Sequence, residues 1–391
     1  MMFACPGRIA AVAVINAMLL WATARSTEIE PIGEGPYAVA MTNLEVSPKG
    51  EVPMFDYLNG KMTASSTVYL TDILTHPEAV PTLPIAVPAG AKVYGALAGR
   101  TIPTVLLVAY PTTHDNARPD YPFPYKDTGD KLVPHMQRPG ERPLFAAPGK
   151  FPLIVLSGGY NTHALWHFEH LKLLASHGYI VVDVQHGDGR GPSFEGNLAL
   201  RSIEVKAAVD WALHSPDFSE AIDAERIGVL GQSAGGHTVA AILGGTDPTG
   251  RVPTVADARV KMGYGLKPFL GGSAGIWPMK MDLWYFGEDH AGLRAIRKPV
   301  FLFYGGSDTN VPPEGVEDAA KALSGPAMTV ELDGEKHASA DLGRTDWKTW
   351  EVLAFDAWLR GDPAAIETLA TAAAVKGGMN DHVTVRRGAR E

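Results

Sequence analysis

The chain has 391 residues, of which 46% are hydrophobic and 20% are charged, as is typical of a globular protein with a sizeable core. This composition excludes a disordered, collagen-like or coiled-coil chain. The formal net charge is −9, from 34 lysines and arginines against 43 aspartates and glutamates, without a basic block. We therefore expect no nucleic acid partner.

The first residues have the pattern of a secretory signal peptide. Arg8 precedes an apolar run that ends at Ala24, and small residues at Ala22 and Ala24 fit a cleavage site after Ala24. The run is short for a membrane span, and an uncleaved anchor is the alternative. We expect a signal peptide over 1–24, a secreted or periplasmic protein, and no stable membrane span after cleavage. Cleavage would remove Cys5, the single cysteine, and so exclude disulfides and a cysteine nucleophile.

Residues 25–100 are predicted to form an N-terminal extension with leading strands, for example at Tyr37–Met41. A second strand-like piece is Thr101–Tyr110. The stretch 111–150 is rich in proline and charge and is predicted to be a long surface loop. The main domain is expected over 101–375, followed by a C-terminal tail over 376–391.

After residue 150, short apolar runs alternate with helical segments, which predicts an α/β fold with a mostly parallel sheet covered by helices on both faces. The predicted strands are Leu153–Ser157, Ile180–Asp183, Ile227–Leu230, Lys261–Leu266, Val300–Tyr304 and Thr329–Leu332. The predicted helices are 162–177, 198–214, 234–244, 346–359 and 364–375.

The segment Gly231-Gln232-Ser233-Ala234-Gly235 is a Gly-x-Ser-x-Gly pattern between a predicted strand and a predicted helix. A sharp turn there lifts the serine hydroxyl above the sheet edge, and glycine fits where a Cβ would clash. The same turn places the Ala234 N–H at a helix N-terminus, where it can face an oxyanion. The pattern therefore predicts Ser233 as a nucleophile, the alternative being a glycine-rich turn that packs a helix on a sheet.

A second match to the same pattern is centred on Ser273, in Gly271-Gly272-Ser273-Ala274-Gly275. Pro268 and Pro278 lie close on either side, and neither a clean strand nor a helix flanks it. We therefore assign this second match to a flexible loop.

A serine nucleophile needs a base and an orienting carboxylate further along the chain. Asp308 follows an apolar predicted strand, and His337 lies in the polar loop after the next one. With Ser233 they fall at the C-terminal ends of predicted parallel strands, which share one crevice. The plain alternatives are a turn-capping aspartate and a solvated histidine. Weaker candidates at less suitable places are Asp282, Glu288, His237 and His290.

The loop after the first predicted strand of the main domain reads Gly158-Gly159-Tyr160. Adjacent glycines let the backbone approach a substrate, so the Tyr160 N–H is the preferred second oxyanion donor and Gly159 is the next choice. The alternative is a tight strand-to-helix turn. In the later loop 186–191, Asp188 and Arg190 are expected to fix the loop rather than react.

These residues resemble the α/β-hydrolase superfamily, and more narrowly its dienelactone-hydrolase-like branch, which includes platelet-activating-factor acetylhydrolases and cutinase-like polyester hydrolases. The matching pieces are Phe151–Tyr160, Leu174–Val182, the serine turn, Asp308, His337 and Ala354–Pro363. The resemblance covers about residues 100 to 372, whereas the leading region has no match that we can name. Many members have His-Gly or Pro-Gly where this chain has Ser157-Gly158-Gly159.

The resemblance implies a serine esterase with Ser233 as nucleophile, His337 as base, Asp308 orienting the base, and oxyanion donors from Tyr160 and Ala234. The acyl-enzyme would form and then be hydrolysed by water, without a metal or organic cofactor. His337 must be neutral to act as a base, so activity should fall on the acid side, near about pH 6 to 7.

The stretch 267–298 holds several aromatic residues among glycines and is predicted either to form a lid over the site or to complete the core. In the lid interpretation Trp277 and Trp284 bind an apolar part of the substrate. The Gly159 backbone, on its own loop, is also expected to contact the substrate. We expect a small-molecule or polymeric ester as substrate. The alternatives are a serine peptidase of the same fold, and a non-catalytic binding protein on this fold.

Overall fold

The fold is built on a large mixed sheet, which contains eleven strands among the residues that the structure describes. The structure is a computed structural model. It describes residues 27–42, 82–118, 123–124, 131–132, 135–137, 141–162, 164–276, 279–283, 285–338 and 345–386. The predicted signal peptide, 1–24, lies outside the described residues.

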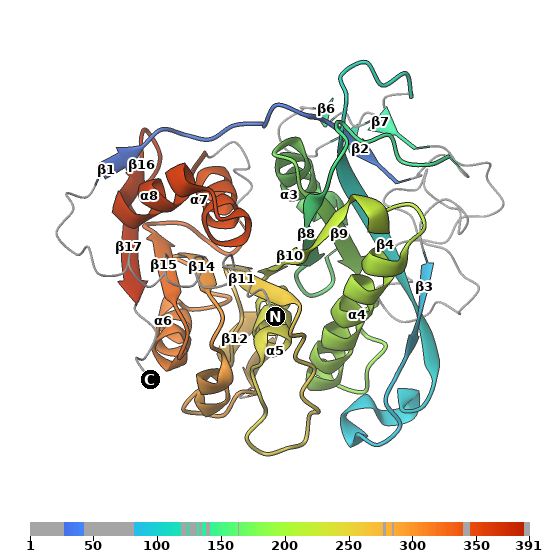
Figure 1. Cartoon of the computed structure of the whole chain (residues 1–391). Helices are drawn as coiled ribbons and strands as arrows, with labels where there is room; N and C mark the ends of the chain where they lie inside the picture. The colour runs from blue at the N-terminus through green and yellow to red at the C-terminus, as the bar shows by residue number, and fades with distance from the viewer. Residues whose placement is uncertain are drawn as a thin grey trace, which may run out of the picture.

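Six neighbouring strands of this sheet run parallel, in the order β15-β14-β11-β10-β8-β9. They are β15 (Ala327–Leu332), β14 (Val300–Gly305), β11 (Val260–Leu266), β10 (Ile222–Gln232), β8 (Phe151–Ser157) and β9 (Ile180–Gln185). Each strand predicted after residue 150 lies within one of them. The parallel arrangement brings the carboxyl ends of the six strands to one edge of the sheet (Figure 1).

Antiparallel strands extend this sheet on both sides. On one side β4 (Thr101–Thr112) pairs with β9, and both β2 (Ala38–Met41) and β3 (Thr82–Ala86) pair with β4. The two-residue strand β7 (His135–Met136) lies parallel to β2. On the other side β17 (Asp381–Arg386) pairs with β15. The described parts of the predicted extension and tail therefore contribute strands to the central sheet.

The beginning and the end of the described chain meet in a second, small sheet. Strand β1 (Thr27–Ile29) pairs in parallel with β16 (Ala372–Val375), at the left of Figure 1. The helix predicted over 364–375 was wrong in its last part: α8 (Pro363–Thr371) ends where β16 begins. Pairing with β1, a contact between distant parts of the chain, competes with the local helical preference of the alanines there.

Helices cover both faces of the sheet, as predicted. Helices α4 (Phe194–His214), α5 (Ala234–Leu243) and α6 (Pro313–Ala322) pack in one apolar cluster. Helices α3 (Ala164–Ser176), α7 (Thr345–Phe355) and α8 pack in the other, together with the π-helical turn η5 (Asp356–Arg360). Short 3-10 helices are η2 (Lys92–Leu97), η3 (Ser219–Ala221) and η4 (Ala291–Ala295).

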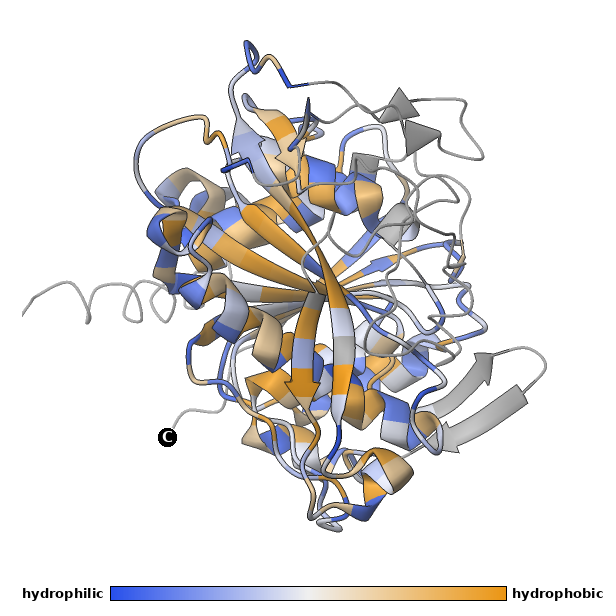
Figure 2. Ribbon diagram, turned by 90° about the vertical axis from the view of Figure 1, so that its right-hand side faces the viewer, coloured by the Kyte–Doolittle hydropathy of each residue, from blue (hydrophilic) through white to orange (hydrophobic). Residues whose placement is uncertain are grey.

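The central strands are buried on both faces because helices cover each side. In β8, Leu153 and Val155 join the cluster with α4 and α5, whereas Ile154 and Leu156 join the cluster with α3 and α7. A continuous apolar run of this kind is typical of a parallel sheet. Figure 2 shows these hydrophobic strands side by side at the centre of the molecule.

Two hairpins lie outside the central sheet. In the predicted surface loop 111–150, β5 (Phe123–Pro124) pairs with β6 (Lys131–Leu132). The second hairpin joins β12 (Gly272–Ile276) and β13 (Met279–Leu283). Within the described ranges, no helix is both long and apolar enough to cross a membrane.

Candidate active site

Ser233 lies in a strained turn between β10 and α5. Its backbone has φ +54° and ψ −116°, an uncommon conformation for a residue with a Cβ. The turn is fixed on both sides, because the Ser233 N–H donates to the Leu266 carbonyl (3.0 Å) and the Ser233 carbonyl accepts from the Phe269 N–H (2.8 Å). The hydroxyl is therefore presented at the carboxyl edge of the sheet, and the side chain is partly exposed.

The glycines of the pattern are needed for space. A Cβ at Gly235 would lie 1.8 Å from the Ser157 carbonyl oxygen, and one at Gly231 would lie 2.1 Å from the Gly235 carbonyl oxygen. Both distances are far below van der Waals contact, and backbone atoms cannot rotate away. The turn consequently packs tightly against the end of β8.

The structure brings the three residues of the predicted triad together. The His337 Nε2 lies 2.9 Å from the Ser233 Oγ, and the His337 Nδ1 lies 2.7 Å from the Asp308 Oδ2. With its proton on Nδ1, the imidazole donates to the carboxylate and accepts from the serine hydroxyl, which is the arrangement needed for general-base activation. We call these three residues the candidate triad.

The Asp308 carboxylate is held by the backbone of its own loop. Its Oδ1 accepts from the Asn310 N–H (2.9 Å) and the Val311 N–H (2.8 Å), which leaves Oδ2 for His337. The Asp308 side chain is fully buried, whereas that of His337 is 13% exposed. The exposed fraction of the side chain thus increases from Asp308 to His337.

The weaker candidates lie in other settings. His237 is fully buried, with its ring centroid 4.0 Å from that of Tyr285, and burial lowers its pKa to about 3. His290 is also buried, in a left-handed turn, and Glu288 is exposed. Asp282 lies in β13.

The prediction of a flexible loop around Ser273 was wrong. Residues Gly272–Ile276 form β12, and Ser273 is paired with Asp282 across the hairpin. Cross-strand hydrogen bonding, which depends on the later strand, orders this glycine-rich segment. The Ser273 backbone is therefore that of a strand and not of a strand-to-helix turn.

The loop with the predicted second oxyanion donor lies directly beside the serine turn. A Cβ at Gly159 would lie 2.6 Å from the Gln232 Oε1, so Cα of Gly159 is close to the residue before Ser233. Ala234 is the first residue of α5, where backbone N–H groups have no partner within the helix. Gly159 thus lies on a loop close to the serine turn, and Ala234 lies in that turn itself.

Aromatic side chains lie beside this loop. The Tyr160 ring contacts Phe194 at 4.9 Å, and Phe194 contacts Phe269 at 6.0 Å between ring centroids. The Tyr160 hydroxyl accepts from the Asn197 side chain (3.3 Å), and burial raises the pKa of Tyr160, as does the charge of Asp188. We call Tyr160, Phe194 and Phe269 the aromatic wall.

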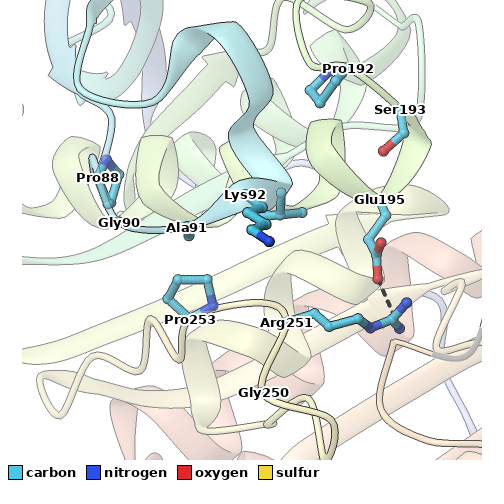
Figure 3. Close-up of a pocket in the computed structure, with 11 residues that line it drawn as sticks. Pro88, Gly90, Ala91, Lys92, Pro192, Ser193, Glu195, Gly250, Arg251 and Pro253 are labelled. Atoms are coloured by element: carbon cyan, nitrogen blue, oxygen red, sulfur yellow. Dashed lines mark ion pairs between the residues drawn. The ribbon is translucent and has the colours of Figure 1, made fainter.

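A groove with a volume of about 660 Å³ is lined in part by Ser193 and Glu195, the two chain neighbours of Phe194 (Figure 3). It lies between the segment leading into η2, the start of α4 and the loop after α5. Its lining includes Lys92, Glu195, Arg251, Pro88, Pro192 and Pro253. Glu195, which follows Phe194, pairs with Arg251 at 3.2 Å, as the dashed line in Figure 3 marks.

Sequence reasoning missed Arg201, which holds the Gly158-Gly159-Tyr160 loop. This α4 residue is 1% exposed and donates to the carbonyl oxygens of Gly158 (2.6 Å) and Gly159 (2.7 Å). Its guanidinium also forms a two-point pair with Asp188, whose Oδ2 accepts from the Asn161 N–H (2.8 Å). Asp188 thus fixes its surroundings, as expected. The available signal was an arginine among the apolar residues Leu198, Leu200 and Ile203 of the predicted helix.

A second row of serine, histidine and carboxylate was also missed. The Ser157 Oγ lies 2.9 Å from the His186 Nε2, and the His186 Nδ1 contacts the Glu204 carboxylate. We call Ser157, His186 and Glu204 the buried row, because they are 2%, 3% and 1% exposed. The Glu204 carboxylate also forms an ion pair with the Arg190 guanidinium. No substrate can reach this serine without unfolding of its surroundings.

The segment 267–298 is described in part. Phe269, Tyr285 and Phe286 are buried in the core cluster of α4 and α5, which agrees with the interpretation that these aromatics complete the core. Trp277 and Trp284 lie outside the described residues. Their assignment to substrate binding stays a prediction.

Comparison with known proteins gives one family. The model of the prolyl oligopeptidase family matches residues 166–249, a segment that contains Ser233 but neither Asp308 nor His337. A search of the curated proteins finds no match. Together the fold and this match indicate a serine hydrolase with the α/β-hydrolase fold.

Proposed function

We propose that this protein cleaves carboxylic esters through an acyl-enzyme on Ser233. The observation that supports this most is the position of His337, which lies within hydrogen-bond distance of both Ser233 and Asp308. In a serine hydrolase such an imidazole removes the hydroxyl proton during attack and returns it to the leaving group. We further propose that the protein belongs to the dienelactone-hydrolase-like branch.

The proposed reaction has two acyl-transfer steps. In the first, the Ser233 Oγ attacks the ester carbonyl, its proton passes to the His337 Nε2, and the same proton leaves with the alcohol. In the second, His337 takes a proton from water, whose oxygen attacks the acyl-enzyme. The same proton passes to the Ser233 Oγ as the bond to the acyl group breaks and the acid is released. The Ala234 and Tyr160 N–H groups, with Gly159 as the alternative for the second, are proposed to stabilise the oxyanion.

The aromatic wall supports a substrate with an apolar group next to the scissile bond. We propose that Tyr160 donates its N–H to the oxyanion and that its ring, which contacts Phe194, limits the space for the substrate. The groove lined by Ser193 and Glu195 is large enough for a further part of an extended or polymeric ester. We also keep the proposal that 267–298, with Trp277 and Trp284, forms a lid.

Peptide hydrolysis is the second candidate function. The family match over 166–249 favours it, because that family is described as prolyl oligopeptidase. An amide needs the same nucleophile and base, and its amine leaving group needs protonation by the same imidazole. Only the relative rates on esters and peptides separate the two candidates.

The organisation of the chain is part of the proposal. A signal peptide over 1–24 would direct the protein out of the cytoplasm, followed by the extension over 25–100, the catalytic domain over 101–375 and the tail over 376–391. Mass determination of the protein from the extracellular or periplasmic fraction tests the first assignment. A chain that begins at Arg25 supports it, and a full-length chain refutes it.

Labelling with a fluorophosphonate probe tests the nucleophile directly. We expect the purified protein and its Ser273→Ala variant to be labelled, and Ser233→Ala to remain unlabelled. A panel of p-nitrophenyl esters and peptide anilides, compared by kcat/KM, then decides between esterase and peptidase. A folded wild-type protein that neither reacts with the probe nor cleaves any substrate would favour a non-catalytic binding protein.

A further inference from the structure

Lys267 is a buried cation beside the candidate triad. It directly follows β11, its backbone has φ +46°, and its side chain is 9% exposed. The ammonium Nζ lies 2.7 Å from the Glu335 Oε1, 2.6 Å from the Lys336 carbonyl oxygen and 3.3 Å from the His337 carbonyl oxygen. It therefore holds the backbone of the residue that is proposed to be the base.

The burial of this ammonium is compensated at its own site. A lysine ammonium has three N–H donors, and a charge out of water is costly unless it is paired and hydrogen-bonded. Here a carboxylate and two carbonyl oxygens face Nζ, so the fold satisfies the charge with the backbone of the histidine loop. Simple packing of that loop would need only an apolar side chain.

Lys267 also adjoins the anchor of the nucleophile. The carbonyl of Leu266, the preceding residue, accepts from the Ser233 N–H (3.0 Å). The Lys267 N–H in turn donates to the Phe303 carbonyl in β14 (2.6 Å). The Lys267 backbone is thus fixed between β11, the strand beside Ser233, and β14, the strand that leads to the loop of Asp308.

Glu335 extends the same connection to the acid. Its carbonyl accepts from the N–H of Ser307 (2.9 Å), the residue before Asp308. A Cβ at Gly305 would lie 2.3 Å from the same carbonyl oxygen, so the two loops pack closely. The Lys267–Glu335 pair therefore lies where the nucleophile, acid and base loops meet.

We propose that Lys267 is a positioning residue that keeps the His337 imidazole in line with Ser233. This inference rests on the proposed function. Lys267 acts through the carbonyls of Lys336 and His337, and a misplacement of a reacting group by about 1 Å can reduce the rate about 100-fold. Because Nζ faces the protein backbone and not the substrate, the loss falls on kcat and leaves KM nearly unchanged.

The first test compares Lys267→Met with a matched control, Lys298→Met. Lys298 is also partly buried and donates to a backbone carbonyl, that of Asp257 (2.6 Å), but it precedes β14 and so lies at the amino end of the sheet. On the best p-nitrophenyl ester we expect kcat to fall about 100-fold in Lys267→Met, with KM within about twofold. Lys298→Met should keep the wild-type kcat and KM.

The second test restores the ammonium chemically. Cys5 is the single cysteine of the sequence, so Lys267→Cys in a Cys5→Ser background offers one thiol. The unfolded variant is alkylated with 2-bromoethylamine, which rebuilds a lysine-like ammonium, or with bromoethane, which leaves a neutral chain of similar shape, and is then refolded. We expect the aminoethylated protein to recover most of the wild-type kcat, and the ethylated protein to behave like Lys267→Met.

The outcomes separate the inference from the proposed function. Wild-type protein without probe labelling or hydrolysis refutes the proposed function, and with it the role of Lys267. If the wild type is active, three results would refute the positioning role alone. Lys267→Met could fold with unchanged kcat, or only its KM could rise. The two alkylated proteins could also fold and have equal kcat. If the aminoethylated protein refolds and the ethylated protein does not, the role of Lys267 is purely structural. This result also overturns the inference.

Discussion

The candidate triad and the buried row have the same sequence of hydrogen-bonding groups in one molecule. In both, a serine hydroxyl lies 2.9 Å from an imidazole Nε2 and the Nδ1 contacts a carboxylate. They differ at the serine: Ser157 ends a strand and is 2% exposed, whereas Ser233 has φ +54° and is partly exposed. Backbone geometry and access to solvent, rather than the hydrogen bonds, therefore distinguish the two serines.

The carboxylates of the two rows are also satisfied differently. Asp308 is held by backbone N–H groups of its own loop, so its position depends on local chain geometry. Glu204 contacts Arg190, and burial lowers the pKa of His186, as does the charge of Arg201. The buried row is therefore part of a larger charged network that includes Arg201, which binds the Gly158 and Gly159 carbonyl oxygens.

The largest expected difference between the rows is at the serines. Ser233→Ala should abolish probe labelling and reduce kcat by about 10⁴-fold or more, because the nucleophile is lost. Ser157→Ala should keep labelling and cost about 1–3 kcal/mol of stability, since the His186 Nε2 loses its buried partner. Labelling and urea unfolding of both variants check this. Loss of labelling in a folded Ser157→Ala protein would contradict the division between the rows.

Asp308→Asn tests the acid of the candidate triad. The amide keeps the shape but favours the wrong imidazole tautomer, so we expect kcat to fall about 10⁴-fold. The unfolding midpoint should change little, because the Asn310 and Val311 N–H groups keep an oxygen acceptor. Steady-state kinetics and urea unfolding measure the two effects. A variant within tenfold of the wild-type kcat would show that another group orients His337.

Removal of the Glu204 carboxylate should reduce stability and leave labelling intact, the opposite of what we expect for Asp308→Asn. Glu204→Ala leaves the Arg190 guanidinium, whose side chain is 5% exposed, without its carboxylate. We expect a loss of about 3–5 kcal/mol in the free energy of unfolding, as for other broken buried pairs. Probe labelling of the fraction that stays folded should persist. A loss below about 1 kcal/mol would mean that water compensates the network.

The smallest expected effect is a pH dependence of stability. The folded state lowers the pKa of His186 below its ordinary value of 6.5, so below that pH the unfolded chain binds a proton that the folded chain does not. Stability contributed by the neutral imidazole is thus present above about pH 6.5 and decreases as the pH falls, by at most about 1.4 kcal/mol per unit.

Urea unfolding between pH 7.5 and 5.0 measures this slope. We expect it to be shallower in His186→Gln than in the wild type. It should remain above zero, because burial also lowers the pKa of His237 and His290. Identical slopes in both proteins would show that folding does not lower the pKa of His186.

The sequence was most informative where local patterns suffice. Apolar runs predicted the six parallel strands, and the glycines around Ser233 predicted the turn whose Cβ clashes the structure shows. Asp308 and His337 could be selected because each follows such a strand. Their meeting at hydrogen-bond distance was an expectation from sheet topology, and the structure shows that contact.

What depended on partners far apart in the sequence was decided by the tertiary structure. The pairing of β16 with β1 and of β17 with β15 replaced a predicted helix end and tail, and the Ser273 segment became a strand through its pairing with β13. The strands and the serine turn could be predicted because they depend on neighbouring residues. The contacts of Arg201, Lys267 and the buried row could not, because buried charges are stabilised only by groups that the completed fold brings to them.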